Sequence, residues 1–235
     1  MIASLLFGER CLLCERAAGV LCADCRLDLA AREALRLRCP QCAEAVAVRS
    51  LAPCHRCVTH ATVFDQTICG ADYAVPVDGI DRALKYRRHL AGARLLATLI
   101  VDAVERRPVD RPQLLTAVPL SRPRLAERGY NQAWLIARSV AHGLRLPLVT
   151  RALQRRRPTV ALTRLGASER REAIADAFVA GDARRVEGRT VGLVDDVMTT
   201  GATMDAAARV LKAMGASRVI ALPALRTPVA APELH

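Results

Sequence analysis

Apolar residues from about residue 68 onward follow two alternating patterns. Short apolar runs bounded by Pro, Gly or charged residues are typical of strands buried on both faces, and three occur, at 114–118, 191–194 and 219–222. Longer segments carry apolar residues at helical spacing, over 90–104, 133–144 and 203–214. A further strand is expected over 68–77, followed by a short helix over 78–85. Strands that alternate with helices predict an α/β fold with an open, mostly parallel sheet flanked by helices.

One strand–loop–helix–strand unit, at 190–221, carries the most informative residues. Two adjacent acids, Asp195 and Asp196, follow its first strand, and a threonine-rich loop leads through Gly201 into the helix. Free N–H groups at a helix start, hydroxyls and the helix dipole all favour a phosphate there. The loop has no Lys and no GxGxxG spacing, so it is neither a P-loop nor a dinucleotide site. A ribose 5-phosphate would give its phosphate to the loop and its hydroxyls to the acids; the alternative is an ordinary turn with solvated acids.

The sequence LVDDVMTTGATM resembles the phosphoribosyl pyrophosphate (PRPP) signature of type I phosphoribosyltransferases, in which two acids follow a strand and precede a T-T-G-x-T loop. This resemblance implies that Asp195 and Asp196 are the catalytic pair and hold the ribose hydroxyls. It also implies that the residues after the acids complete the PRPP site. Val197 and Met198 come first, and the 5′-phosphate is wrapped by the five that follow: Thr199, Thr200, Gly201, Ala202 and Thr203.

Eight of the nine cysteines form four CxxC pairs in the first 60 residues. Each pair can point two sulfurs at one metal, and two pairs supply the four thiolates that zinc prefers. Disulfides are the competing interpretation, less favoured in a chain without a signal-peptide pattern. In sequence order, the ligands of two structural Zn²⁺ ions are Cys11, Cys14, Cys22 and Cys25, then Cys39, Cys42, Cys54 and Cys57; an interleaved pairing is the alternative. Because a module of about 60 residues buries little apolar surface, metal binding would supply most of its folding energy.

Positive charge is concentrated in the middle of the chain. The whole sequence has 35 Lys or Arg and 23 Asp or Glu, and residues 80–172 hold 20 of the former against seven of the latter. Such a field suits a polyanion, either a diphosphate or single-stranded DNA, although solvated Arg on helix faces would give a similar composition. Aromatic residues are only 3%, which leaves few side chains on which bases could stack. No apolar run reaches the length of about 18 residues that a membrane helix needs, and we expect a cytoplasmic protein with no membrane insertion.

The whole layout resembles the competence protein F family, whose members join an N-terminal zinc ribbon to a phosphoribosyltransferase domain. The resemblance rests on the four CxxC pairs, the PRPP signature and the motifs Leu84-Lys85-Tyr86, Val118-Pro119-Leu120 and Arg128-Gly129-Tyr130-Asn131-Gln132. It implies a double zinc ribbon over 1–60 and a type I phosphoribosyltransferase-like domain over 61–235. Two departures from the family pattern, at 159–162 and at Ala173, lie where a second substrate or a partner would bind.

The resemblance also implies how PRPP, bound with Mg²⁺, would lie at the carboxyl ends of the strands. Its diphosphate would lie near Pro119 and Leu120 and be neutralised by Lys85, Arg122 and Arg128. Three functions stay open at this level. The first is a phosphoribosyltransferase-like protein that supports DNA uptake in natural transformation, with single-stranded DNA and a DNA translocase as partners. The others are an active phosphoribosyltransferase in nucleotide salvage and a PRPP-sensing regulator without turnover.

Overall fold

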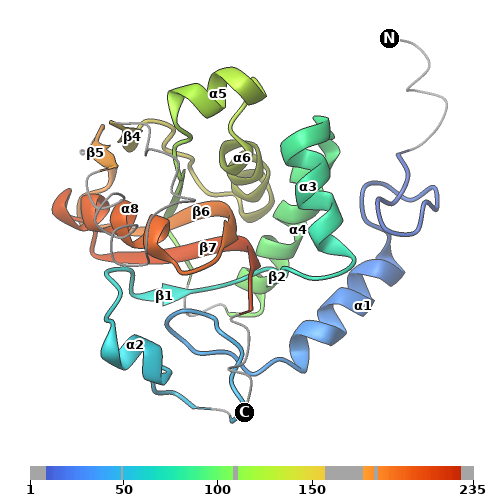
Figure 1. The fold of residues 1–235 in the computed structure, drawn as a ribbon, viewed down its shortest axis with the longest axis horizontal. Helices are drawn as coiled ribbons and strands as arrows, with labels where there is room; N and C mark the ends of the chain where they lie inside the picture. The colour runs from blue at the N-terminus through green and yellow to red at the C-terminus, as the bar shows by residue number, and fades with distance from the viewer. Residues whose placement is uncertain (1–8, 49, 108–110, 157–176, 183–184, 229–235) are drawn as a thin grey trace, which may run out of the picture.

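The computed structural model describes residues 9–48, 50–107, 111–156, 177–182 and 185–228. At its centre is a five-stranded sheet whose described pairs are all parallel: β1 (Gln66–Thr67), β2 (Ala71–Asp72), β3 (Leu114–Ala117), β6 (Thr190–Met198) and β7 (Arg218–Arg226). The strand order is β1-β7-β6-β3, and β2 also pairs with β7 (Figure 1). The predicted open, parallel sheet is therefore confirmed.

Helices cover both faces of this sheet (Figure 1). On one face lie α3 (Val77–Arg87), α4 (Ala91–Glu105) and α6 (Gln132–Leu144), which share an apolar core with Val194 and Leu222 of the central strands. On the other face lies α8 (Ala202–Ala213), where Leu211 packs in a second core with Val191 and Val219. Because β6 and β7 are covered on both faces, their sequences are nearly continuous apolar runs.

The edge of the sheet beside β7 differs from the strand expected over 68–77. The two short strands β1 and β2 stand in its place, and α3 begins at Val77. A Cβ on Gly70 would lie 2.6 Å from the carbonyl oxygen of Ala224, so the backbone comes too close to β7 for any side chain at this position. The glycine marks a close backbone approach that interrupts the strand.

The strand predicted over 191–194 is longer than expected. β6 continues to Met198 because β7 runs beside it, and the parallel register places Asp195 opposite Pro223 and Val197 opposite Leu225. Both acids of the PRPP-like signature therefore lie inside a strand rather than in the loop after it. Consecutive strand residues face opposite sides of a sheet, so Asp195 and Asp196 have different surroundings.

The cysteine-rich segment lies against the same scaffold. Its helix α1 (Ala23–Ala34) buries Leu29 in the core that α4 shares, and Arg26 of α1 forms an ion pair with Asp102 of α4. The short helix α2 (His55–Thr59) begins inside the last CxxC pair. The division into two domains at residue 60 stays a prediction.

A small antiparallel pair, β4 (Leu153–Arg155) and β5 (Phe178–Ala180), lies beside α8 (Figure 1). Residues 159–162 and Ala173, where the sequence departs from the family pattern, fall outside the described residues. In the part of the chain that the structure describes, no helix is both long and apolar enough to cross a membrane.

Candidate functional site

Asp196 lies at the centre of a buried polar cluster formed by β6, α3 and α6. Its Oδ2 atom is 3.0 Å from Lys85 Nζ and accepts a hydrogen bond of the same length from Gln132 Nε2. Its Oδ1 atom accepts a bond of 2.8 Å from the amide of Val197. Only 5% of Asp196 is exposed, so fixed donors hold this carboxylate in one orientation.

Lys85 connects Asp196 to a second buried acid, Asp81. Lys85 Nζ lies 2.9 Å from Asp81 Oδ2, and Asp81 is fully buried. Burial opposes the charge on Lys85, but the charges of Asp196 and Asp81 outweigh it and raise the lysine pKa. Burial raises the pKa of Asp81 in spite of the neighbouring lysine. Asp81 Oδ1 and Gln132 Oε1 have no hydrogen-bond partner among the described residues, so the cluster offers two further acceptors to a ligand or to water.

Asp195 is half-buried, and its Oδ1 atom accepts a 3.0 Å hydrogen bond from the amide of Asp196. Burial, followed by the charge of Asp196, raises the pKa of Asp195 well above its usual range. Burial acts in the same direction on Asp196, but the charge of Lys85 reverses it, so the pKa of Asp196 is lowered. The pair therefore combines one firmly ionised acid with one that takes up a proton readily.

The loop after β6 presents backbone donors that no described residue uses. No described residue accepts a hydrogen bond from the amides of Thr199, Thr200, Gly201 or Thr203. Gly201 has a φ of 86°, a left-handed conformation that turns the chain into α8 and that favours glycine. Thr199 and Thr200 are exposed. The loop thus combines free amides, hydroxyls and a helix start, which together suit an anionic group such as phosphate.

The other predicted site residues gather where β3 ends. Pro119 and Leu120 are half-buried and lead into α5 (Arg122–Arg128). Arg128 lies over the ring of Tyr86, 5.7 Å from its centroid, and its buried Nη1 atom has no hydrogen-bond partner in the described chain. Its charge also acts on Asp81, so the structure brings Arg128 close to the Lys85 cluster.

For three of the predicted site residues, the side chain does not join the polar cluster around Asp196. Arg122 is exposed at the start of α5 and forms no ion pair with any residue that the structure describes. The Met198 side chain is buried in the core beside α8, and Val197 is half-buried against the other core. For Met198 and Val197, the backbone rather than the side chain borders the candidate site.

Two residues of the cluster were not among the predicted site residues. Gln132 fixes Asp196, and Asp81 shares the charge of Lys85. A signal existed for both. Asp81 precedes Lys85 by four residues, the spacing that places two side chains on one helix face, and Gln132 ends the motif that begins at Arg128.

Two groups of cysteines could each hold a metal ion. The sulfurs within each group lie within 4.8 Å of one another, and the groups are Cys11, Cys14, Cys22 and Cys25, then Cys39, Cys42, Cys54 and Cys57. The pairing in sequence order is confirmed, and all nine cysteines are free thiols. Burial opposes ionisation of Cys11 and Cys39, but backbone N–H donors outweigh it and lower their pKa values to about 6 and about 7. These donors favour the thiolate, which is the form that binds metals, so both groups fit a divalent cation.

The two groups repeat one backbone motif, R-C-x-x-C, which begins at Arg10 and again at Arg38. In both copies the arginine donates a 3.0 Å hydrogen bond to the carbonyl of the residue after the second cysteine, Glu15 or Ala43. Glu15 and Ala43 both have positive φ, 63° and 54°. The two cysteine groups are therefore built on equivalent turns, and a position in one has a counterpart in the other.

Comparison with known proteins agrees with this architecture. The family profile named Phosphoribosyl transferase domain matches residues 131–230, from the start of α6 past the end of β7. Together with the parallel sheet and the two cysteine groups, this match defines a protein with the type I phosphoribosyltransferase fold and a cysteine-rich N-terminal module.

The relatives are more specific. DNA utilization protein YhgH from Escherichia coli is 32% identical over 213 residues, which are 89% of this chain and 86% of the relative. Competence protein F from Haemophilus influenzae is 28% identical over 171 residues, 71% of this chain and 75% of that protein. The chain belongs to the family of DNA utilization protein YhgH and competence protein F. Among solved structures, a glutamine PRPP amidotransferase from Bacillus subtilis matches 56% of this chain and 26% of its own, with 18% identity and a TM-score of 0.39.

Proposed function

We propose that this protein binds PRPP together with Mg²⁺ at the carboxyl end of β6. One observation carries this proposal: free backbone amides and a pair of acids lie next to each other at the end of β6. Four backbone amides between Thr199 and Thr203 are without acceptors in the described chain, and the acids Asp195 and Asp196 come shortly before them. The free amides would bind the 5′-phosphate, and the acids would bind the ribose hydroxyls. The match to the phosphoribosyl transferase family supports this assignment.

Lys85 takes a supporting part in this proposal. PRPP is strongly anionic, and unscreened carboxylates beside its ribose would repel it. Lys85 forms ion pairs with two buried acids, Asp81 and Asp196, so its positive charge offsets their negative charges. The diphosphate is then assigned to the backbone after Pro119 and to the side chains of Arg122 and Arg128. Mg²⁺ bound with the ligand would neutralise further diphosphate charge and keep several of its waters.

The same arrangement suits the charge separation of a phosphoribosyl transfer. When the bond from C1′ to diphosphate breaks, positive charge develops on the ribose ring and negative charge on the leaving oxygens. Carboxylates near the ring and arginines near the diphosphate stabilise these charges. An active enzyme would release diphosphate when an acceptor attacks C1′, whereas a PRPP sensor would bind without release.

A calorimetric titration of the full chain with PRPP tests the binding proposal. We expect saturable binding that requires Mg²⁺ and is lost when Asp195→Ala is combined with Asp196→Ala. The thermal unfolding midpoint of that variant shows whether it still folds. Equal affinity in the double variant would contradict the site. A diphosphate-release assay with nucleobases, amines and single-stranded DNA as acceptors then separates turnover from sensing.

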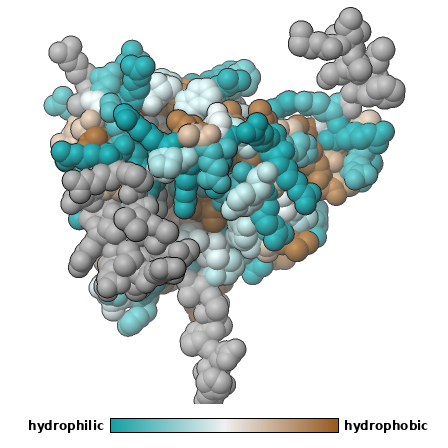
Figure 2. All heavy atoms as spheres, turned by 45° about the horizontal axis from the view of Figure 1, so that its top comes forward, coloured by the Kyte–Doolittle hydropathy of each residue, from teal (hydrophilic) through white to brown (hydrophobic). Residues whose placement is uncertain are grey.

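A second proposal concerns single-stranded DNA. Arg87, Arg88 and Arg124 are exposed near the end of α3 and the start of α5, and none forms an ion pair with a described residue. Figure 2 turns the upper side of Figure 1 toward the viewer and shows mainly hydrophilic side chains there, with a few hydrophobic residues between them. We propose that this surface, the arginine face, binds DNA phosphates, in line with the names of the relatives.

Salt dependence tests the arginine face. Each neutralised phosphate of a single strand contributes about 0.7 to the slope of log affinity against log salt. Changing Arg87→Ala and Arg88→Ala together should therefore reduce that slope by about 1.4, measured by anisotropy of labelled DNA. As a control, Arg32→Ala removes an exposed arginine that pairs with Asp28 on α1 and should leave the slope unchanged. Absence of binding at low salt would contradict DNA binding.

We also propose that each cysteine group holds zinc. Four thiolate donors in a closed arrangement are the usual set of a structural zinc site, in which the metal stabilises the fold and performs no chemistry. Metal analysis of the purified protein by mass spectrometry tests this identity, and a stoichiometric content of another metal would contradict it.

A further inference from the structure

Arg226 joins the candidate phosphate loop to the second cysteine group. We propose that this arginine is a positioning residue, through which metal in the group Cys39, Cys42, Cys54 and Cys57 and PRPP in the site stabilise each other. The inference rests on the proposed PRPP site and adds to it a link with one of the two metal centres. The first cysteine group has no such link in the described chain.

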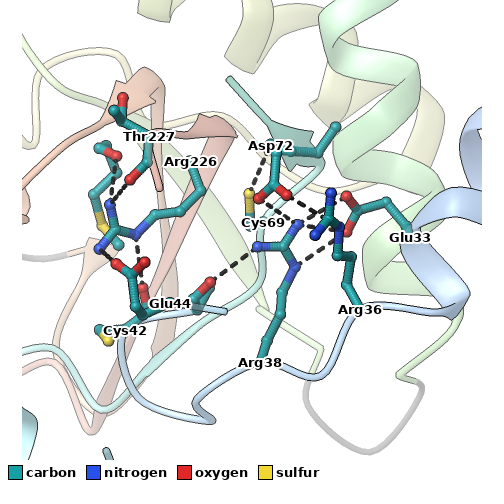
Figure 3. A network of polar contacts seen from close by, with 12 residues as sticks. Glu33, Arg36, Arg38, Cys42, Glu44, Cys69, Asp72, Arg226 and Thr227 are labelled. Atoms are coloured by element: carbon teal, nitrogen blue, oxygen red, sulfur yellow. Dashed lines mark hydrogen bonds and ion pairs between the residues drawn. The ribbon is translucent and has the colours of Figure 1, made fainter. Parts of the chain in front are cut away.

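Arg226 is the last residue of β7 and is fully buried. Its Nη1 atom donates to the carbonyls of Met198, at 3.1 Å, and of Thr199, which are the last residue of β6 and the first of the loop. Its Nε atom donates at 3.1 Å to the carbonyl of Cys42, a predicted metal ligand, and its Nη2 atom lies 2.6 Å from Glu44 Oε2. Figure 3 shows the guanidinium turned toward Cys42, Glu44 and Thr227.

The second cysteine group fixes the partners of Arg226. Cys39 donates from its amide to the carbonyl of Glu44, so the turn that carries the first two sulfurs also orients the Glu44 backbone. Metal bound by Cys39 and Cys42 would hold this turn, and with it both the Cys42 carbonyl and the Glu44 carboxylate. Loss of the metal would release the turn and leave buried guanidinium donors with displaced acceptors, which is unfavourable where water cannot replace them.

A neighbouring network anchors the same segment to the sheet. Arg38 has only 7% of its side chain exposed. Its Nη2 atom lies 2.8 Å from the carboxylate of Glu33 on α1 and 2.8 Å from that of Asp72 on β2. Arg38 also donates to the carbonyl of Ala43, next to Glu44, and Figure 3 shows this network beside that of Arg226. The turn is thus tied to the sheet on one side and to the phosphate loop on the other.

The first cysteine group provides an internal comparison. Arg16 occupies the position equivalent to Glu44 in the repeated turn, and it pairs with Asp24 of α1. Both side chains are largely exposed, at 63% and 65%. An exposed pair of this kind contributes little, and no described contact connects it with the phosphate loop. The two metal sites should therefore differ in their response to PRPP.

Coupling between two binding sites is reciprocal, so PRPP must strengthen metal binding as much as metal strengthens PRPP binding. The test uses full-length protein that retains one metal group at a time. Cys11→Ser with Cys14→Ser leaves only the second group, and Cys54→Ser with Cys57→Ser leaves only the first. Release of zinc to a dye that does not bind Mg²⁺ is followed with and without saturating PRPP and Mg²⁺. We expect PRPP to slow release from the second group about 5-fold or more and to leave the first group nearly unchanged.

Point variants locate the coupling. Glu44→Gln and Arg226→Lys should each reduce the effect of PRPP on zinc release from the second group, whereas Arg16→Ala should preserve it. Glu44→Gln is the safer variant because its side chain is partly exposed, and the unfolding midpoint shows whether Arg226→Lys folds. PRPP that binds by calorimetry but slows zinc release from neither group, or from both equally, overturns this inference alone. A protein that binds no PRPP contradicts the proposed function and this inference together.

Discussion

Lys85 Nζ lies 3.0 Å from Asp196 Oδ2, although the two residues come from a helix end and a strand end that are far apart in the sequence. The same ammonium group is also 2.9 Å from Asp81 Oδ2, so one positive charge serves two buried acids. This shared charge explains how a carboxylate with 5% exposure can stay ionised next to a second acid. It also makes Lys85 a residue on which stability and the proposed PRPP binding should both depend.

Lys85→Met should therefore be strongly destabilising. The variant leaves Asp81 and Asp196 without their counter-charge, and breaking a buried ion pair typically costs about 3–5 kcal/mol. We expect a loss of this size in the free energy of unfolding, measured by urea denaturation at neutral pH. Lys85→Arg keeps the charge and should lose less. A loss below about 1 kcal/mol for Lys85→Met would contradict the shared-charge description.

The two adjacent acids should respond to pH with opposite signs. Asp195 has a raised pKa in the folded protein, so its ionisation opposes folding above the ordinary value of about 4. Asp195→Asn should thus stabilise the protein, and the gain should grow as pH rises from about 4 through the raised pKa. It should vanish at lower pH, where the carboxyl is protonated in both states.

Asp196 has a lowered pKa, so its ionised form stabilises the fold above a pH of about 4. Asp196→Asn should destabilise the protein at neutral pH, and the difference should shrink as pH falls through the lowered pKa. Thermal unfolding midpoints of the two variants over a pH series measure both effects. Shifts of the same sign for Asp195→Asn and Asp196→Asn at neutral pH would show that the surroundings of the acids are wrongly described.

A substitution at Gly201 tests the conformation of the loop after β6. Its φ of 86° is left-handed, so Gly201→Ala should cost about 1 kcal/mol, although its Cβ would contact nothing closer than 3.7 Å. Strain at this position should also weaken PRPP binding, because the neighbouring amides would shift. Gly188→Ala is a matched control, since Gly188 has a φ of 69° with open space around it and lies away from the loop. We expect the two variants to lose similar stability in denaturation experiments. By calorimetry, only Gly201→Ala should lose PRPP affinity. Equal PRPP affinities of the two variants would argue against the loop as the phosphate site.

Metal removal should unfold the cysteine-rich segment before the sheet. The small apolar cluster around Cys39, Cys42 and Cys57 contains few side chains besides the cysteines, so apolar packing adds little to the polar contacts that Arg38 and Arg226 make with this turn. Treatment with a chelator should raise amide exchange over residues 9–60 and leave α4 and α6 protected, as followed by hydrogen exchange with mass spectrometry. Unchanged exchange over 9–60 after complete metal removal would contradict a structural role for the metal.

The sequence was sufficient for those parts of the molecule whose signals are local. The CxxC spacing identified both cysteine groups, and the signature at 190–203 identified the strand, the acids and the loop. Strand ends were less accurate, since β6 extends to Met198 only because β7 supplies partners to the same point. Pattern alone does not reveal how far a neighbouring strand continues.

Contacts between distant residues could not be predicted in the same way. Arg226 reaches Cys42 across 184 positions of the chain, and Lys85 of α3 reaches Asp196 of β6. In the sequence Arg226 is one of 33 arginines, without a motif that distinguishes it. Its burial and its partners follow from the docking of the cysteine-rich turn on the end of β7, which only the folded structure contains.

Everything proposed for this site depends on the free amides of the loop after β6 binding the phosphate of PRPP. The most direct test follows the backbone amide signals of Thr199, Thr200, Gly201 and Thr203 by NMR in isotope-labelled protein during titration with PRPP and Mg²⁺. We expect these four signals to shift and saturate together, while the amide signal of Gly188 does not move. Saturation of the protein with PRPP without any shift of the four loop amides would contradict this assignment.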